Sequence, residues 1–427
     1  MAHQTLTSAY DRLTGRLNKF PQGAPPSDLL RKILQMLFSE REAHLVSLLP
    51  IRPFTVKQAA AAWKLPESEA QKTLETLAGR AILVDWEGRD GAQRYALPPP
   101  MAGFFEFAMM RVRDDIDQKV LAELFHQYIT VEDDFVRALF TEGETQMGRA
   151  FVQEAAVPEA HSLAVMDYER ASEVINTATH IGIAMCYCRH KAMHLGKNCD
   201  APMDICMTFN GSADTLIRHG IVRRIEKAEC RELLAKAQEH NLVQFGENTQ
   251  QGVNFICNCC GCCCEAMVAA RRFGMMRPVH TTNFLPEVDG KKCTGCGKCA
   301  SLCPVEAMSL VSANDPHNKN RKTAKIDGRV CLGCGVCVRP CAKEAITLKP
   351  RKQRVITPLT SSRRVIAMAV ERGKLQNLLF DHQDSLTHRA LAAVFGAVLK
   401  LPPVKRAVAA KALNSRYLDT LIAKKTV

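Results

Sequence analysis

The chain has 427 residues, of which 47% are hydrophobic and 24% are charged. This composition is typical of a globular chain long enough for two to four domains, and it excludes a disordered protein, a collagen and a small secreted disulfide scaffold. Lys and Arg exceed Asp and Glu by 57 − 44 = 13, and such a basic balance favours an acidic partner such as nucleic acid, anionic lipid or an acidic protein.

The first residues, MAHQTLTSAYDRL, contain no apolar stretch of the kind found in a secretory signal. No apolar run reaches the roughly 18 residues that a membrane-spanning helix needs. We therefore expect a cytoplasmic protein, in which thiols stay reduced and can bind metal.

Residues 1–110 are expected to form the first domain. Apolar spacing predicts helices over 28–49, 55–63 and 67–78, and alternation predicts strands over 82–86 and 93–97 joined by a turn. This order of elements resembles a winged helix of the kind found in many bacterial regulators. The third of these helices carries three Glu and one Lys over 67–76, the wrong charge for DNA, and only Arg89 and Arg94 of the wing would help. DNA is therefore an unfavoured partner, and a winged helix with a structural role or one that docks a partner is expected instead.

Residues 111–185 are predicted to be a helical connector, with helices over 114–125, 132–139 and 168–179. A Cys-rich, helical middle domain is expected over 186–280, with helices over 213–220 and 227–240. All 19 cysteines of the chain lie between Cys186 and Cys341. Such clustering with C-x-x-C spacing indicates metal ligation, because structural disulfides would be spread along the chain.

The middle domain holds ten candidate metal ligands in two groups along the chain. They are Cys186, Cys188, Cys199 and Cys206, then Cys257, Cys259, Cys260, Cys262, Cys263 and Cys264. Neighbouring side chains diverge, so adjacent cysteines are expected to serve different sites or to stay unligated. Ten thiols can hold one or two additional iron–sulfur clusters, with zinc or free redox-active thiols as alternatives. The spacing does not assign single cysteines to single clusters.

Four other residues of this region bear on the site. Arg189, beside Cys188, either offsets the negative charge of a cluster or is a surface charge. His190 and His194 share a helix face and are either ligands or ordinary polar histidines. Cys230 lies alone in a helical stretch and is expected to be an ordinary buried cysteine. The run Cys186-x-Cys188-Arg-His resembles a motif of multi-cluster iron–sulfur proteins of anaerobes.

Residues 281–350 contain an internal repeat with an offset of 38, since Asp289-Gly290 matches Asp327-Gly328 and every cysteine is in register. The two runs are C-x2-C-x2-C-x3-C, and short spacing on a tight loop lets three thiolates reach three irons of one cube. Four glycines are expected to allow left-handed backbone and close approach to the cluster: Gly295, Gly297, Gly333 and Gly335. The eight cysteines are Cys293, Cys296, Cys299, Cys303, Cys331, Cys334, Cys337 and Cys341.

These runs closely resemble the bacterial two-cluster ferredoxin domain, 2[4Fe–4S]. In that family the fourth cysteine of each run ligates the other cluster. The resemblance implies one cluster held by Cys293, Cys296, Cys299 and Cys341, and a second held by Cys331, Cys334, Cys337 and Cys303. The second run departs from the family pattern because Ala342 replaces the proline that follows the first run, Pro304. Zinc ribbons are the alternative for C-x-x-C pairs.

Residues 351–427 form a basic C-terminal segment, with 15 Lys and Arg against 4 Asp and Glu. Helices are predicted over 365–379, 386–400 and 404–413. These basic helices either contact an anionic membrane or an acidic redox partner, or pack on the protein with a solvated face.

The fold class is therefore α+β: a mostly helical chain with a winged-helix-like domain, a Cys-rich helical domain, a ferredoxin-like two-cluster domain and basic C-terminal helices. We expect an iron–sulfur electron-transfer protein of an anaerobic redox system, which exchanges electrons with redox partner proteins. One alternative is an iron–sulfur redox-sensing transcription regulator that uses the winged helix. Another is a reductase, an oxidoreductase with an active cluster in the Cys186–Cys264 region, although no catalytic motif is recognisable.

Overall fold

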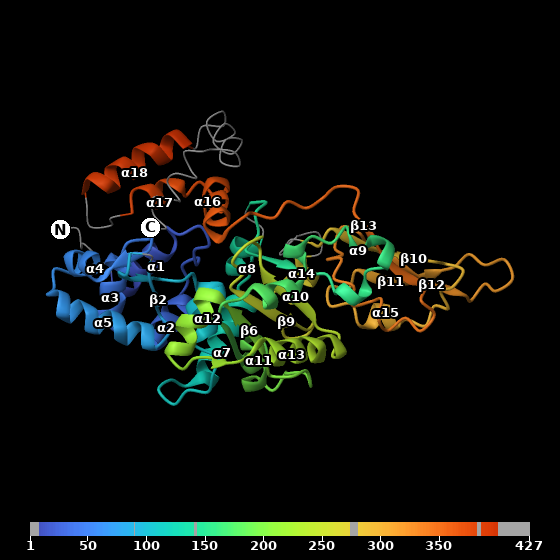
Figure 1. The fold of residues 1–427 in the computed structure, drawn as a ribbon. Coiled ribbons are helices and arrows are strands. Elements are labelled where there is room, and N and C mark those ends of the chain that lie inside the picture. The colour runs from blue at the N-terminus through green and yellow to red at the C-terminus, as the bar shows by residue number, and fades with distance from the viewer. Residues whose placement is uncertain (1–7, 89, 141–142, 274–280, 382–385, 400–427) are drawn as a thin grey trace. The chain divides into compact units, whose positions relative to one another are not determined.

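The computed structural model describes residues 8–88, 90–140, 143–273, 281–381 and 386–399 (Figure 1). The helix expected over 404–413 and the wing residue Arg89 lie outside these ranges. The chain divides into two compact units, one of residues 1–145, 214–222 and 362–427, and the other of residues 146–213 and 223–361.

The first unit begins with a helical region and a small sheet. Its helices are α1 Ala9–Leu17, α2 Asp28–Leu37, α3 Glu40–Leu48, α4 Val56–Trp63 and α5 Glu67–Gly79. The antiparallel sheet has the order β1-β3-β2, with β1 Phe54–Thr55, β3 Gln93–Ala96 and β2 Val84–Glu87. The single helix expected over 28–49 is wrong, because Ser39 accepts a hydrogen bond from the Glu42 amide in a capping box and starts a new helix.

The first unit continues through short helices and the basic segment. They are η1 Pro100–Phe104, α6 Phe105–Phe107, α7 Gln118–Phe125, η2 His126–Val131, α8 Asp134–Phe140, α16 Ser361–Glu371, α17 Leu375–Leu379 and α18 Leu386–Leu399. The helix expected over 365–379 is broken, because Gly373 has a φ of 64° between α16 and α17. None of the helices in the described part of the chain is long and apolar enough to cross a membrane.

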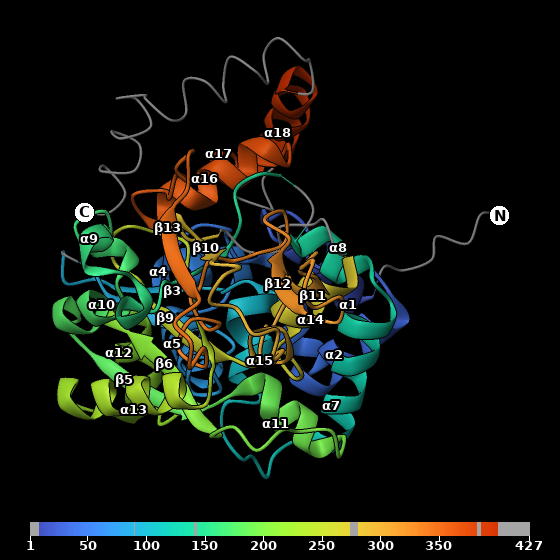
Figure 2. The same ribbon diagram turned by 90° about the vertical axis from the view of Figure 1, so that its right-hand side faces the viewer.

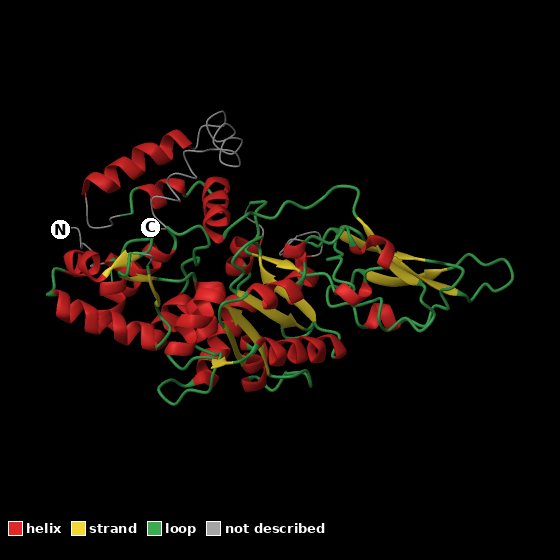
Figure 3. Ribbon diagram, viewed as in Figure 1, coloured by secondary structure: helices red, strands yellow, loops and turns green. Residues whose placement is uncertain are grey.

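The second unit contains a six-stranded antiparallel sheet in the order β4-β8-β9-β6-β5-β7 (Figure 3). The strands are β4 Gly148–Ala150, β5 Ile181–Met185, β6 Asp204–Phe209, β7 Arg223–Arg224, β8 Val243–Glu247 and β9 Phe255–Cys259. The expectation that the middle domain is purely helical is therefore wrong. Apart from the exposed β7, the strands are short and largely buried, so their apolar runs lack the alternation that would distinguish them from helix.

Helices accompany this sheet. They are η3 Glu154–Ala156, α9 Glu159–Ser162, η4 Asp167–Glu169, α10 Ala171–Thr177, α11 Tyr187–His194, α13 Lys227–Glu239 and α14 Glu265–Phe273. Helix α12, Asn210–Arg218, starts in this unit and continues into residues 214–222, which belong to the first unit. Ile175 of α10 and Leu234 of α13 belong to one apolar core with Ile183 of β5 and Phe209 of β6. Apart from Cys230, this core consists of aliphatic and aromatic side chains, methionine included, so the sheet region has an apolar core independent of the candidate metal ligands.

The last strands of the second unit form two antiparallel two-stranded sheets (Figures 1 and 2). Strand β10, Phe284–Val288, pairs with β13, Ile346–Pro350, and β11, Met308–Ser312, pairs with β12, Lys322–Ile326. Helix α15, Lys298–Ser301, lies in the first half. The strands repeat with the offset of the sequence, since 322 − 284 and 346 − 308 both equal 38. Each pair of strands therefore joins a strand of one half to a strand of the other.

Candidate metal centres

The glycines of the two ferredoxin-like loops adopt the predicted left-handed conformation. Gly295, Gly297, Gly333 and Gly335 have φ values of 69°, 81°, 70° and 90°. A Cβ on Gly295 would lie 2.4 Å from the Lys322 carbonyl oxygen, and one on Gly333 would lie 2.0 Å from that of Phe284. Each loop is thus pressed against the first residue of a strand, where only glycine fits.

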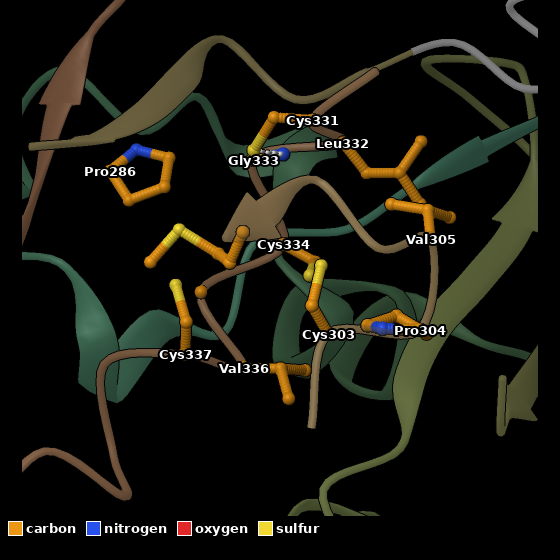
Figure 4. A pocket seen from close by; sticks show the side chains of 12 residues that line it. Pro286, Cys303, Pro304, Val305, Cys331, Leu332, Gly333, Cys334, Val336 and Cys337 are labelled. Carbon is orange, nitrogen blue, oxygen red and sulfur yellow. Dashed lines mark hydrogen bonds between the residues drawn. The ribbon is translucent and has the colours of Figure 1, made fainter. Parts of the chain in front are cut away.

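Four cysteines from both halves line one pocket of this module (Figure 4): Cys303, Cys331, Cys334 and Cys337. Pro304 and Val305 also line it. These are the four cysteines that the resemblance assigns to a single cluster. Burial raises the pKa of Cys331 to about 11 and that of Cys334 to about 12. The free thiols therefore stay protonated, and metal binding must release their protons.

The other four cysteines of the module lie closer to solvent. Cys296 is exposed, whereas Cys299 is buried, and Cys293 and Cys341 pack against the apolar cluster that contains Cys299. Burial and the nearby Cys293 and Cys296 raise the pKa of Cys299. The pocket of Cys331, Cys334 and Cys337 is more buried, so the two sets of thiols have different environments.

Backbone amides donate to cysteine sulfur in both sets. Ala307 donates to Cys303 Sγ at 3.2 Å, and Ala345 donates to Cys341 Sγ at 3.3 Å, 38 residues later. Ala324 donates to Cys293 Sγ and Gly333 to Cys331 Sγ, each at 3.4 Å. Such amide donors stabilise thiolate charge, and toward a bound cluster they would raise the reduction potential. Together with the glycine loops, these donors fit a [4Fe–4S] group.

In the sheet region, four cysteines converge although Cys199 is far along the chain from the others. The Sγ atoms of Cys199, Cys260, Cys262 and Cys263 all lie within 4.8 Å of one another. Cys262 Sγ is 3.7 Å from Cys263 Sγ, which is 3.9 Å from Cys199 Sγ. Cys199 follows α11, and the other three lie in the loop between β9 and α14. We call this group the quartet; thiols this close can ligate a single tetrahedral metal directly, and they would have to spread apart to hold a cube, whose four thiolates bind four different irons.

The remaining six cysteines of the region form a second group, which we call the sextet. Its members are Cys186, Cys188, Cys206, Cys257, Cys259 and Cys264. The expectation that adjacent cysteines serve different sites agrees with Cys259 and Cys260, which fall in different groups. Cys262 and Cys263 are adjacent and yet share the quartet.

Arg189 is fully buried between the two groups, which removes the alternative of a surface charge. It is 1% exposed, and its guanidinium donates to the carbonyl oxygens of Pro202 at 3.0 Å and Asn258 at 2.7 Å. Its Nε has no hydrogen-bond partner within the described part of the chain. Burial lowers the pKa of Arg189, but attraction to Cys186, Cys260 and Cys259 outweighs this and raises it. A buried cation beside thiols suits a site for an anionic cluster.

Other candidate residues lie apart from the quartet. His190 is buried, and its Nε2 lies 3.2 Å from Nε2 of His194. Among the described residues, the one compact set of candidate metal ligands contains no histidine. Cys230 is 0% exposed in the core of the sheet region, as expected of an ordinary buried cysteine. The ion pair of Lys191 with Glu265 was not foreseen; it joins α11 to α14 and is buried at both ends.

The comparisons with known proteins agree with the ferredoxin-like part. The family model of the 4Fe-4S dicluster domain matches residues 292–345. The searches of curated proteins and of solved structures gave no match. The match supports [4Fe–4S] binding by this part of the chain. The protein is therefore an iron–sulfur protein, and its structure is of mixed α and β type.

Proposed function

We propose that this protein is an electron carrier with at least three iron–sulfur clusters. Two are held by the ferredoxin-like module in the ligand sets that the resemblance implies, and one is held by the quartet. When bound, such clusters accept and donate single electrons. The observation that carries the proposal is the convergence of the four quartet sulfur atoms within 4.8 Å, beside a module that a 4Fe-4S family model matches.

A close contact between the quartet loop and the module supports electron exchange between them. Gly261 lies between Cys260 and Cys262 of the quartet, and a Cβ on it would be 2.9 Å from Cα of Pro304. Pro304 follows Cys303, a ligand in the module's more buried set, and lines the same pocket. The backbones that carry ligands of two proposed clusters are therefore in contact, which keeps the distance between the clusters short.

Metal analysis of the full chain tests the cluster content. After anaerobic purification, iron and sulfide are compared between the wild type, the double variant C199S/C260S and the matched control C230S. We expect the double variant to lose about four irons with their sulfide, and the control to lose none. Stoichiometric zinc with little sulfide, or unchanged iron in the double variant, would contradict the proposal.

The contact at Gly261 can be tested by electron paramagnetic resonance of the reduced protein. Neighbouring reduced clusters broaden and split each other's signals. The variant G261A places a methyl group against Pro304 and should weaken this interaction while iron content is retained. G211A is a suitable control, because a Cβ there meets nothing within 4 Å. Equal spectra for G261A and the wild type would argue against close clusters.

We also propose that residues 28–97 form a winged helix that docks a protein. The order α2 to α5 followed by the β2–β3 hairpin, with β1 completing the sheet, supports this. Helix α5 has Glu67 and Glu69 in its first turn, and Glu69 pairs with Arg41 at 2.7 Å. Gel shifts with random duplex at low salt should show no binding below micromolar concentration. Salt-sensitive binding there would instead favour the transcription regulator.

A further inference from the structure

The sextet is assembled by the ends of three neighbouring strands. Strands β6 and β9 pair Met207 with Ile256 and Thr208 with Phe255, and continuing this register places Cys206 opposite Cys257. Residues two apart on a strand share a face, so Cys259 lies on the same face as Cys257. On the other side of β6, Cys206 pairs with Ala184 of β5, two residues before Cys186. Strands β6 and β9 thus bring three cysteines together, and Cys186 directly follows β5, beyond a register shift between Ala184 and Met185.

Two helix N-termini supply the last two cysteines. Cys188 is in the first turn of α11, which begins at Tyr187, and Cys264 immediately precedes α14. The Cys264 carbonyl accepts from the Val268 amide at 2.9 Å, and its sulfur accepts from the amides of Ala266 and Met267. Amide groups and the positive end of a helix favour negative charge at this place.

The six thiols contact one another in an unbroken chain. Cys188 is hydrogen-bonded to Cys186 and Cys264. Cys259 is hydrogen-bonded to Cys264 and Cys257. Cys257 in turn contacts Cys206. Thiols are weak hydrogen-bond donors and weak acceptors, so contacts between thiols alone would stabilise a group of six only slightly. A metal cluster would give each sulfur a strong bond.

Strand geometry separates the sextet from the quartet. Successive side chains of a strand point to opposite faces, so Cys259, the last residue of β9, and Cys260 are directed apart. Arg189 lies close to Cys186 and Cys259 of the sextet and to Cys199 and Cys260 of the quartet. A single buried cation thus faces both groups and can lower the repulsion between two anionic centres.

We propose that the sextet is a second iron–sulfur site of the sheet region, separate from the quartet and able to offer a cluster up to six thiolates. The inference rests on the proposed function and extends it. One cube uses four thiolates, so the site has two thiols beyond the requirement of a cube and has the ligands for a cluster of four or more irons. A fully loaded chain would then hold about sixteen irons or more, of which the module and the quartet account for about twelve.

Iron analysis distinguishes this inference from the proposed function. The variant C206S/C257S removes the opposed pair of the sextet, C199S/C260S removes half of the quartet, and C230S is the control. We expect each double variant to lose about four irons or more with sulfide, and the combined quadruple variant to keep about eight. If C206S/C257S keeps all of its iron while C199S/C260S loses iron, the sextet inference fails and the proposed function stands. If C199S/C260S keeps its iron, the proposed function itself fails.

A measurement on the wild-type protein avoids variants that fail to fold. The native, iron-loaded chain is alkylated with iodoacetamide, and the modified cysteines are mapped by mass spectrometry before and after iron removal with a chelator. We expect the six sextet cysteines to be protected in the loaded protein and to react after iron removal. Full alkylation of Cys206 and Cys257 in the loaded protein, or their recovery as disulfides, would overturn the inference.

Discussion

The ferredoxin-like module and the sheet region both concentrate cysteines, yet they gather them in opposite ways. In the module, Cys331, Cys334 and Cys337 come from one loop that Gly333 and Gly335 hold in a left-handed conformation. In the sheet region, the sextet is collected from β6, β9, the turn between β5 and α11, and the starts of α11 and α14. The first arrangement is dictated by local spacing, whereas the second depends on strand register across the whole region.

The two regions also differ in what stabilises them. Buried members of the module's core include Cys299 and Cys337, with Cys293, Cys303 and Cys341 packed against them. The core of the sheet region contains aliphatic and aromatic residues such as Ile175, Met207 and Phe209, with Cys230 as its one cysteine among the described members. Cysteines thus make up a larger share of the module's core, beside Met308, Ala324 and Ile346, than of the core of the sheet region. We therefore expect the module to depend more strongly on bound metal.

Iron removal is expected to give the largest difference between the two regions. Metal binding is folding free energy where ligands form the core, so the module should unfold when iron is chelated. Hydrogen exchange followed by mass spectrometry should show β10 to β13 losing all protection, while β5, β6 and β9 remain protected. Retained protection of β10 to β13 in the iron-free chain would contradict the idea that the module needs metal more than the sheet region does.

Loss of the buried Lys191–Glu265 ion pair should be the next largest effect. K191M leaves the Glu265 carboxylate buried without this cation, which typically costs about 3–5 kcal/mol. Hydrogen exchange of α11 and α14 should accelerate, and that of the module should not change. The double variant K191M/E265L should recover much of the loss, because a well-packed apolar pair often replaces a buried ion pair without cost. Failure of the double variant to recover would point to a second role of Glu265.

Glycine-to-alanine substitutions in the two ferredoxin-like loops separate the effect of a steric clash from the effect of the left-handed backbone alone. G333A puts a methyl group on the Phe284 carbonyl and should destabilise the module by about 3 kcal/mol, from strain and overpacking together. G297A meets only the Leu310 side chain at 3.4 Å, so it should cost about 1 kcal/mol. The rate of iron release to a chelator should follow this order. Equal release rates would mean that the close approach at Gly333 is not limiting.

Asp85, in the first unit, shows that residues distant along the chain also converge at a site without cysteine. Its carboxylate on β2 accepts from Thr215 Oγ1 at 2.5 Å and from Arg218 Nη1 and His219 Nε2 at 2.9 Å. Burial raises the pKa of Asp85, but these bonds from Arg218, Thr215 and His219 outweigh it and lower it. D85N should cost about 1.5–3 kcal/mol at neutral pH.

The difference in the free energy of unfolding between the wild type and D85N should depend on pH with a definite sign. Since the folded-state pKa of Asp85 lies below its unfolded value of about 3.9, the stabilisation is complete above about pH 4 and is lost as the pH falls through the folded value. Urea unfolding of the wild type and D85N can be followed through Trp63 and Trp86, the two tryptophans of the chain. A difference that grows below pH 4 would contradict the assignment.

The sequence sufficed for the module because its information is local. The offset of 38 located both cysteine runs, and the glycines of those runs have the positive φ that the spacing required. Helices α4, α5 and α13 were likewise found close to their predicted bounds, since each has a clear cap or a long periodic pattern. Local geometry can be inferred without knowing what the rest of the chain does.

The sheet region could not be derived in the same way. Its strands are short apolar runs that periodicity does not distinguish from helix, and the partition of ten cysteines follows from which strand lies beside which. One signal was available and was missed: Cys257 and Cys259 alternate as in a strand. The Ser39-x-x-Glu42 capping box was a similar local signal, and it marks the break in the helix expected over 28–49.

The pairing of the first strand of the module with its last has a consequence for how the protein is made on the ribosome. Strand β10 leaves the exit tunnel first of the four, but its partner β13 is the last strand of the module to be translated. The pocket that begins with Cys303 is likewise completed only by Cys337. Because domains fold as units when their last element emerges, cofactor delivery to this module has to wait for nearly all of it, and a prematurely terminated chain would offer the delivery machinery incomplete ligand sets.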